Sequence, residues 1–210
     1  MRDFLDTLII EFDKGLKSSF INKNVSNRVY PANDLKENKL SELERNHSSS
    51  LMRVNHAGEV CAQALYLGQS LTAKDISIKA QMLKAADEEE DHLAWCSKRL
   101  EELEDNQSVF NPVWYTLSFS IGMLTGLAGD KWSLGFVEET EKQVVSHLDS
   151  HLHKISKKDL KSKAIIEQMK QDESGHADQA KESGSRELPE ELKLGMSRVA
   201  KVMTSTSYYF

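Results

Sequence analysis

The sequence reads Glu-Glu-Asp-His at residues 89–92 and Glu-Ser-Gly-His at residues 173–176, and these two short segments are the strongest indication of the fold. Each contains a Glu-x-x-His pair, and each pair follows a lone glutamate by about thirty residues, Glu59 in the first case and Glu141 in the second. A helix with one glutamate, a turn and a helix with Glu-x-x-His are therefore predicted twice. Four carboxylates and two imidazoles from four helices are the ligand set of a di-iron or di-manganese site inside a helical bundle.

Helical phase separates these pairs from chance matches in a glutamate-rich chain. Glu89 and His92 fall on an apolar stripe with i, i+3, i+4 spacing, and the other candidate ligands fall on similar stripes. The neighbours on these faces are Met82, Ala85, Ala86, Leu93, Cys96 and Leu100 for Glu89 and His92; Met52, Asn55, Ala62 and Tyr66 for Glu59; Val137, Val144 and Leu148 for Glu141; and Ile166, Met169, Ala177 and Ala180 for Glu173 and His176. Carboxylates aimed at a core cost several kcal/mol each unless they are neutralised or paired. A pair of divalent cations would supply the missing charge.

A third match, Glu44/His47, lacks this context. It precedes three serines, and no lone helical glutamate lies about thirty residues before it. We interpret it as a solvated helix end rather than as a ligand pair.

Composition predicts an all-α fold. The 210 residues, 39% hydrophobic, can form one sizeable core, and only ten Gly and three Pro interrupt long stretches with helical periodicity. We expect two regions: residues 1–50, an amphipathic helix followed by a polar connector, and residues 51–210, a ferritin-like four-helix bundle with a long crossover. The expected bundle helices span residues 51–73, 76–103, 133–154 and 160–183, and a last helix spans residues 190–203.

Charge and cysteine content narrow the class and the compartment. A net charge of −6 disfavours nucleic acid as a partner. Cys61 and Cys96 are too few for a disulfide scaffold or a four-cysteine metal module. Residues 1–20 carry acidic residues among the apolar ones and show no cleavable signal pattern, so we expect a cytoplasmic protein.

Residues 111–129 contain no charged residue and raise the question of a membrane span. A span would place the two ligand pairs on opposite sides of the membrane and destroy the site. We therefore interpret this run as the crossover between the two halves of the bundle, partly packed and partly exposed. The last helix has an apolar stripe flanked by Lys193, Arg198 and Lys201, which suits either an anionic membrane surface or a cap on the bundle.

Several residues beside the six ligands remain open to more than one interpretation. Glu138, one turn before Glu141, could replace it as a ligand. Tyr66 and His147 are candidate catalytic residues, although packing explains Tyr66 equally well and His147 could be an ordinary core histidine, as could His56. The nearest acidic acceptors for the second imidazole nitrogens are Asp91 and Asp172.

Four segments of the chain resemble those of a known family. The segment 53–59 (Arg-Val-Asn-His-Ala-Gly-Glu), the run 89–93, the stretch 137–141 leading to His147, and the segment 172–176 are similar to those of the demethoxyubiquinone hydroxylases. The resemblance covers about residues 51–205. It implies a ferritin-like fold, a di-iron centre of two Fe ions, and hydroxylation of a polyprenylated demethoxy quinone or quinol with O2 and two electrons. It also implies peripheral attachment to the membrane, here at its cytoplasmic face.

Carried over position by position, the resemblance implies the same six metal ligands: Glu59, Glu89, His92, Glu141, Glu173 and His176. Residues 1–45 add a helix that shorter members lack, and the resemblance implies no role for it. Other ubiquinone-biosynthesis proteins, an electron donor or a second copy of the chain could be partners. The alternatives are another ferritin-like di-iron oxidase or ferroxidase, a hydroxylase acting on modified tRNA, and a metal-free helical adaptor that binds membranes. Iron and manganese both accept this ligand set.

Overall fold

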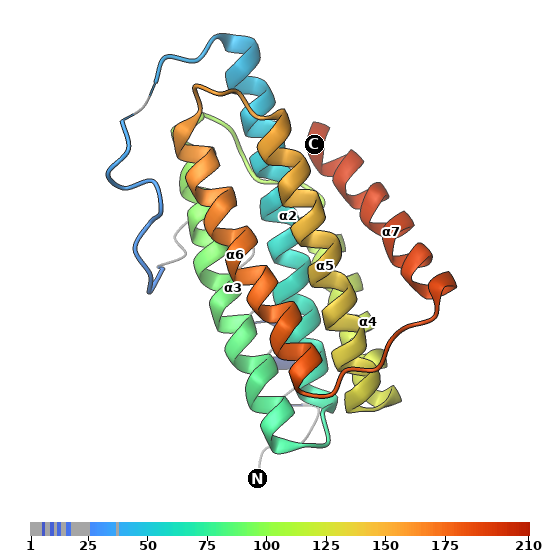
Figure 1. Ribbon diagram of the computed structural model, residues 1–210. Coiled ribbons are helices and arrows are strands. Elements are labelled where there is room, and N and C mark those ends of the chain that lie inside the picture. The colour runs from blue at the N-terminus through green and yellow to red at the C-terminus, as the bar shows by residue number, and fades with distance from the viewer. Residues whose placement is uncertain (1–5, 7–8, 11, 14–15, 18–25, 37) are drawn as a thin grey trace.

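The computed structural model describes residues 6, 9–10, 12–13, 16–17, 26–36 and 38–210, and this part of the chain contains helices and no strands (Figure 1). The helices are α2 (Glu42–Thr72), α3 (Ile76–Glu102), α4 (Asn111–Ala128), α5 (Asp130–Lys154), α6 (Leu160–Glu182) and α7 (Glu190–Tyr209). The prediction of an all-α fold is confirmed.

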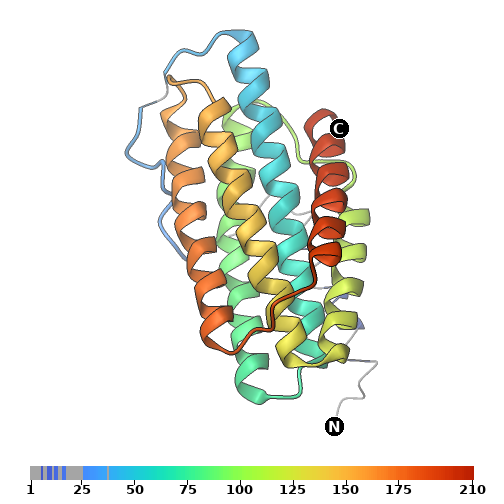
Figure 2. The same cartoon turned by 45° about the vertical axis from the view of Figure 1, so that its right-hand side comes forward.

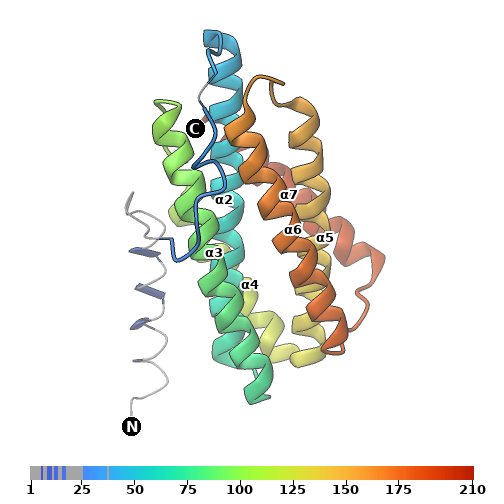
Figure 3. The same ribbon diagram turned by 60° about the vertical axis from the view of Figure 1, so that its left-hand side comes forward.

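The bundle consists of two helical hairpins, α2–α3 and α5–α6, which face each other (Figure 3). Local capping explains where their second helices begin. Asp75 accepts a hydrogen bond from the Ser77 amide at the start of α3, and Asp159 accepts one from the Ser162 amide at the start of α6. The buried guanidinium of Arg99, in the last turn of α3, binds Asp159 at 2.8 Å. This ion pair joins the two hairpins where α3 ends and α6 begins.

Helix α2 begins nine residues before the predicted start at residue 51. Ser41 and Glu44 form a capping box, in which each side chain bonds the backbone amide of the other residue. Ser48 and Ser49 are buried, so tertiary packing outweighs the weak helix propensity of the serine run. The predicted connector to residue 50 was therefore too long, and the last helix was predicted too short, since α7 continues to Tyr209.

Helix α4 is the uncharged run, and it forms the crossover between the hairpins. Glycines on both helices let α4 approach α2 closely, because a Cβ on Gly122 of α4 would overlap the Leu65 carbonyl and one on Gly68 of α2 would overlap the Phe119 carbonyl. Gly129, at φ 117°, is the single residue between α4 and α5 and allows the sharp turn between them. The opposite face of α4 is exposed and carries Val113, Leu117, Leu124 and Leu127.

Helices α4 and α7 both pack against the outer side of α2 (Figure 2). Among the described residues, no helix combines the length and the apolar character needed to cross a membrane.

Most of the predicted N-terminal helix, residues 1–20, lies outside the described residues. The residues of this segment that are described are helical. Among them, the Phe12 ring contacts Tyr115 and Phe119 edge-on, at centroid distances of 5.4 and 5.2 Å. The segment therefore packs against α4 at this point.

Candidate metal centre

The six predicted ligands come from the four bundle helices and all lie inside the bundle. Glu59 is on α2, Glu89 and His92 are on α3, Glu141 is on α5, and Glu173 and His176 are on α6; each is at most 7% exposed. The positions that the apolar stripes indicated are therefore buried as expected.

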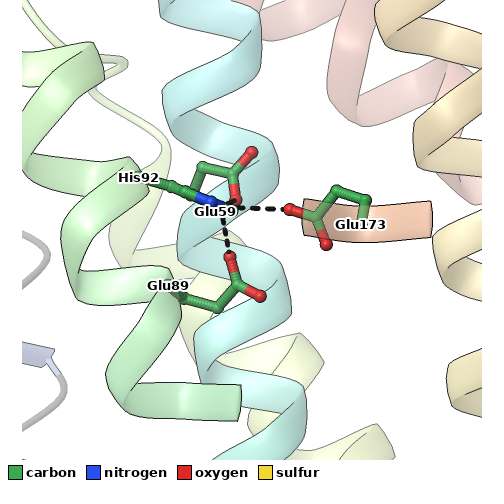
Figure 4. A group of neighbouring side chains, drawn as sticks. All are labelled: Glu59, Glu89, His92 and Glu173. Carbon is green, nitrogen blue, oxygen red and sulfur yellow. Dashed lines mark hydrogen bonds and ion pairs between the residues drawn. The ribbon is translucent and has the colours of Figure 1, made fainter. Parts of the chain in front are cut away.

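The imidazole of His92 is the centre of the first cluster (Figure 4). Its Nδ1 atom lies 3.0 Å from Glu89 Oε2, 3.1 Å from Glu173 Oε1 and 3.3 Å from Glu59 Oε2. A single nitrogen thus faces three carboxylates from three helices. Potential ligand atoms of these four residues all lie within 4.8 Å of one another, close enough to bind one metal ion.

A second cluster forms around His176. Its Nδ1 atom lies 3.0 Å from Glu173 Oε2 and 3.4 Å from Glu89 Oε1, and Glu141 completes a group with Glu173 and His176 within the same 4.8 Å limit. Glu89 and Glu173 therefore each direct one oxygen to His92 and the other to His176. This is the arrangement in which a carboxylate can bridge two cations.

Glu141, rather than Glu138, faces this interior. The buried Tyr66 hydroxyl donates a hydrogen bond of 2.6 Å to Glu141 Oε1, while Glu141 Oε2 accepts no hydrogen bond from any described residue. Glu138 points elsewhere, since it pairs with Lys142 and accepts a hydrogen bond from Ser185. The alternative ligand Glu138 is therefore not part of the cluster.

The electrostatics of the site are those of crowded buried charge. Burial, followed by repulsion from neighbouring carboxylates, raises the pKa of Glu59 and Glu141 well above the ordinary value. Burial alone would lower the pKa of His176, but Glu173 and Glu89 outweigh it and raise that pKa to about 11. The same competition raises the pKa of His92 well above its ordinary value. Without a metal, the cluster therefore retains protons in place of cations.

This donor set suits a pair of metal ions. Hard carboxylate oxygens with one imidazole per ion match iron or manganese in the +2 state. The unpaired Glu141 Oε2 is a buried lone-pair donor that a cation would satisfy.

The second nitrogen of each imidazole contacts the acidic residue that directly precedes the other Glu-x-x-His pair. His92 Nε2 lies 3.0 Å from Asp172 Oδ2, and His176 Nε2 lies 2.7 Å from Glu88 Oε2. Such outer acceptors fix the ring and leave the other nitrogen facing the metal. Asp172 is thus an acceptor as predicted, whereas the prediction of Asp91 was wrong, because the Asp91 carboxylate binds Ser26 and the backbone of residues 27 and 28.

Comparison with known proteins places this geometry in a family. Residues 46–207 match the family described as ubiquinone biosynthesis protein COQ7. The chain belongs to this family. The resemblance seen in the sequence motifs is therefore confirmed, together with the ferritin-like helical bundle that it implied.

Similar curated proteins extend the match to nearly the whole chain. A protein from Legionella pneumophila (strain Corby) is 54% identical over 98% of this chain and 97% of its own length. Relatives from Nitrosococcus oceani and Chromobacterium violaceum are 53% and 50% identical over 98% and 97% of this chain, and 96% and 98% of their own lengths. All three are named 3-demethoxyubiquinol 3-hydroxylase.

The two histidines left open by the sequence lie outside the ligand cluster of this COQ7-family bundle. At a rise of about 1.5 Å per residue, the side chain of His147 originates roughly 9 Å along α5 from Glu141. Its ring contacts His151, with centroids 4.0 Å apart, and burial lowers its pKa to about 4. His56 is fully buried with Nδ1 3.3 Å from the Asn111 amide nitrogen.

Sequence reasoning missed Glu88 and Arg28 in this COQ7-family site. Glu88 had a usable signal, because an acidic residue directly precedes the glutamate of both pairs, Glu88 in one and Asp172 in the other. Arg28 had none, since it binds Asp172 across a separation of 144 residues.

Proposed function

We propose that this protein is a 3-demethoxyubiquinol 3-hydroxylase with two iron ions in the carboxylate cluster. The observation that carries the proposal is a pair of buried half-sites in a chain of the COQ7 family, in which Glu89 and Glu173 each contact both His92 and His176. The reaction converts one ring C–H bond to C–OH. The second oxygen atom of O2 leaves as water, which requires two electrons and two protons.

The protein's own residues would hold the metals and shape their surroundings. Glu59, Glu89 and His92 would hold one ion and Glu141, Glu173 and His176 the other, with Glu89 and Glu173 bridging. When bound, the two ions supply the redox chemistry that activates O2. Asp172 and Glu88 orient the imidazoles, and the near-complete burial of the ligands excludes water from the centre.

Tyr66 and His147 are the residues that we propose for proton handling. Tyr66 donates a hydrogen bond of 2.6 Å to Glu141 Oε1, so its hydroxyl contacts a ligand directly. His147 is neutral at pH 7 because burial lowers its pKa, and its buried Nε2 forms no hydrogen bond with the described residues. It could therefore take up and release a proton on a path to solvent.

We further propose peripheral attachment at the cytoplasmic face of the cell membrane. The start of α4 lies near the end of α7, where the rings of Phe110 and Phe210 are 6.2 Å apart, and exposed leucines and a valine continue along the outer face of α4. Arg198 and Lys201 on α7 are exposed beside Val199 and Val202. An apolar face beside basic residues suits an anionic bilayer, where a polyprenyl tail could stay while the ring reaches the site.

The test of function is complementation of a bacterial strain that lacks its own demethoxyubiquinol hydroxylase. When this chain is expressed, the accumulated demethoxy quinone should disappear and the quinones formed by its hydroxylation should appear, as measured by mass spectrometry of extracted quinones. The purified protein should contain two irons per chain. If the demethoxy quinone still accumulates although the protein binds two irons, the proposed metal centre stands and the proposed substrate is refuted.

Vesicle flotation tests the membrane proposal separately. Leu124→Glu on the exposed face of α4 should reduce binding to anionic vesicles by about tenfold, from the lost burial of one leucine. Leu43→Glu is the matched control, because Leu43 is also exposed but lies at the start of α2. Equal loss in both variants would contradict a membrane-binding face on α4.

A further inference from the structure

The two half-sites match inside the bundle but differ in what supports their outer carboxylates. Asp172, the acceptor for His92, receives Arg28 through two bonds, NH1 to Oδ2 at 2.7 Å and NH2 to Oδ1 at 3.2 Å. Glu88, the acceptor for His176, forms an ion pair with Lys84 at 2.9 Å, and the charge of Arg28 acts on Glu88 less strongly than on Asp172 and Asp91. The supports are therefore of different kinds.

The two cations also differ in exposure and geometry. The Lys84 side chain is 68% exposed and lies one helical turn from Glu88, so water screens this pair and it contributes little. The Arg28 side chain is 37% exposed and Asp172 only 20%. A planar guanidinium that binds both carboxylate oxygens fixes the orientation of the acid, which a lysine does not.

Arg28 is held in place by a short built segment, the N-terminal strap (residues 26–32). Ser26 Oγ lies 2.8 Å from Asp91 Oδ1, and the Asn27 amide donates to the same oxygen at 2.7 Å. The indole of Trp95, next to His92 in the bundle, donates to Ser26 Oγ at 3.1 Å and lies 4.8 Å from the Arg28 guanidinium. Figure 3 shows the strap crossing the face of the α2–α3 hairpin.

The far end of the strap is anchored in the core. Tyr30 and Ala32 are 9% and 1% exposed and belong to a buried cluster with Trp95 and Leu100. The strap therefore has attachments on both sides of Arg28, and the arginine reaches Asp172 from a fixed backbone rather than from a free surface loop.

We propose that Arg28 is a positioning residue for His92: by fixing Asp172, it makes the His92 half of the site bind metal more tightly than the His176 half. The chain from the strap to the cluster has three links, Arg28 to Asp172, Asp172 to His92 Nε2, and His92 Nδ1 to the metal position. This gives the N-terminal strap a role in setting the order in which the two metals load. The inference rests on the proposed two-metal centre but not on the identity of the substrate.

The test is an anaerobic titration of the metal-free, full-length protein with Co2+, followed by calorimetry and by visible absorption. The wild-type protein should bind two equivalents in two unequal steps. Arg28→Gln should weaken the tighter step by about three- to tenfold, less than the direct loss of an outer-shell partner, and leave the weaker step within about twofold. The affinity of Arg28→Lys for the tighter-bound metal should fall between those of the wild type and Arg28→Gln. Lys84→Gln, the matched control at the other half, should change neither step by more than about twofold.

Two backgrounds assign the effect to one half. In His92→Gln the tighter step is removed, and adding Arg28→Gln should then change nothing; in His176→Gln, Arg28→Gln should still weaken the remaining step. Equal weakening of both steps, no weakening, or an effect that persists in His92→Gln would overturn the inference while leaving the two-metal centre intact. Wild-type protein that binds fewer than two Co2+ would refute the centre and the inference together. Thermal unfolding of each metal-free variant separates a positioning effect from a loss of folding.

Discussion

The α2–α3 and α5–α6 halves of the molecule have the same chemistry inside and different chemistry around it. Each half supplies a lone glutamate, a Glu-x-x-His pair and an acidic residue that binds the imidazole of the other half. In the α2–α3 half, the lone Glu59 contacts His92 and the strap covers the outer side. In the α5–α6 half, the lone Glu141 is held by Tyr66, which comes from α2. A repeated unit thus provides the ligands, whereas unrepeated residues make the two halves inequivalent.

Removal of a glutamate shared by both halves should have the largest effect. Glu89 directs one oxygen to each imidazole, so Glu89→Gln should disrupt both metal positions at once. We expect hydroxylation to fall by at least about 10³-fold, as when a group that acts on the reacting centre is lost, and metal content to fall toward zero. Activity and metal analysis on the same preparation measure both.

The control for Glu89→Gln is Asp87→Asn, which removes an exposed carboxylate two residues away on α3. It should keep full metal content and activity. Glu89→Gln with two metals and normal turnover would show that the two halves do not depend on a shared carboxylate.

When the metals are removed, the stability of the folded protein should depend on pH, because both halves of the site contain buried ionisable ligands. The pKa of His176 is raised to about 11 when no metal is bound, so its proton stabilises the folded state fully below pH 6.5 and this contribution is lost as the pH rises toward 11. The raised pKa values of Glu59 and Glu141 act in the same direction, since stability falls as the pH rises above their ordinary value near 4.5. Metal-free protein should therefore become less stable from pH 6.5 upward.

Bound metal should reverse this trend, because it replaces the protons and keeps the ligands deprotonated. We expect Mn2+ at saturation to raise Tm by about 10 °C at pH 7, and the difference between loaded and metal-free protein to grow toward pH 9. Scanning calorimetry across this range is the measurement. A difference that shrinks with rising pH would mean that the cluster does not hold protons in place of cations.

Tyr66 is the clearest unrepeated contact of the α5–α6 half, and its loss should have a smaller effect. Tyr66→Phe removes the hydrogen bond to Glu141 and leaves both carboxylate oxygens without a donor among the described residues. By analogy with other outer-shell partners, we expect about a tenfold loss of kcat with both metals retained. Tyr208→Phe is the matched control, since it also removes a hydrogen bond of a tyrosine hydroxyl, to His47, at the end of α7 and away from the ligands. Equal effects of the two variants would point to stability rather than to the site.

The sequence predicted the six ligands and named Tyr66, but it missed the outer residues Glu88 and Arg28, for a physical reason. Burial of a ligand depends on its phase within one helix, so the apolar stripes were enough to place Glu59 and Glu141 inside the bundle. The crosswise pairing of imidazoles with acids depends on how two helices meet, which periodicity does not encode. The contact of Arg28 with Asp172 depends on the path of an irregular segment between elements, and no local pattern marks it.

His147 tests how far the functional part of the α5–α6 half extends beyond its ligands, and its loss should have the smallest effect. His147 lies beside His151 rather than among the carboxylates, so His147→Gln should lower kcat by about threefold, well below the 10²-fold or more that a positioned general acid contributes. Because burial lowers its pKa to about 4, the wild-type pH profile should show no limb near pH 6.5 that disappears in the variant. His153→Gln, at an exposed position on the same helix, is the control. A loss of 10²-fold with both metals bound would instead make His147 a direct proton donor and extend the functional asymmetry of the two halves to the next two turns of α5.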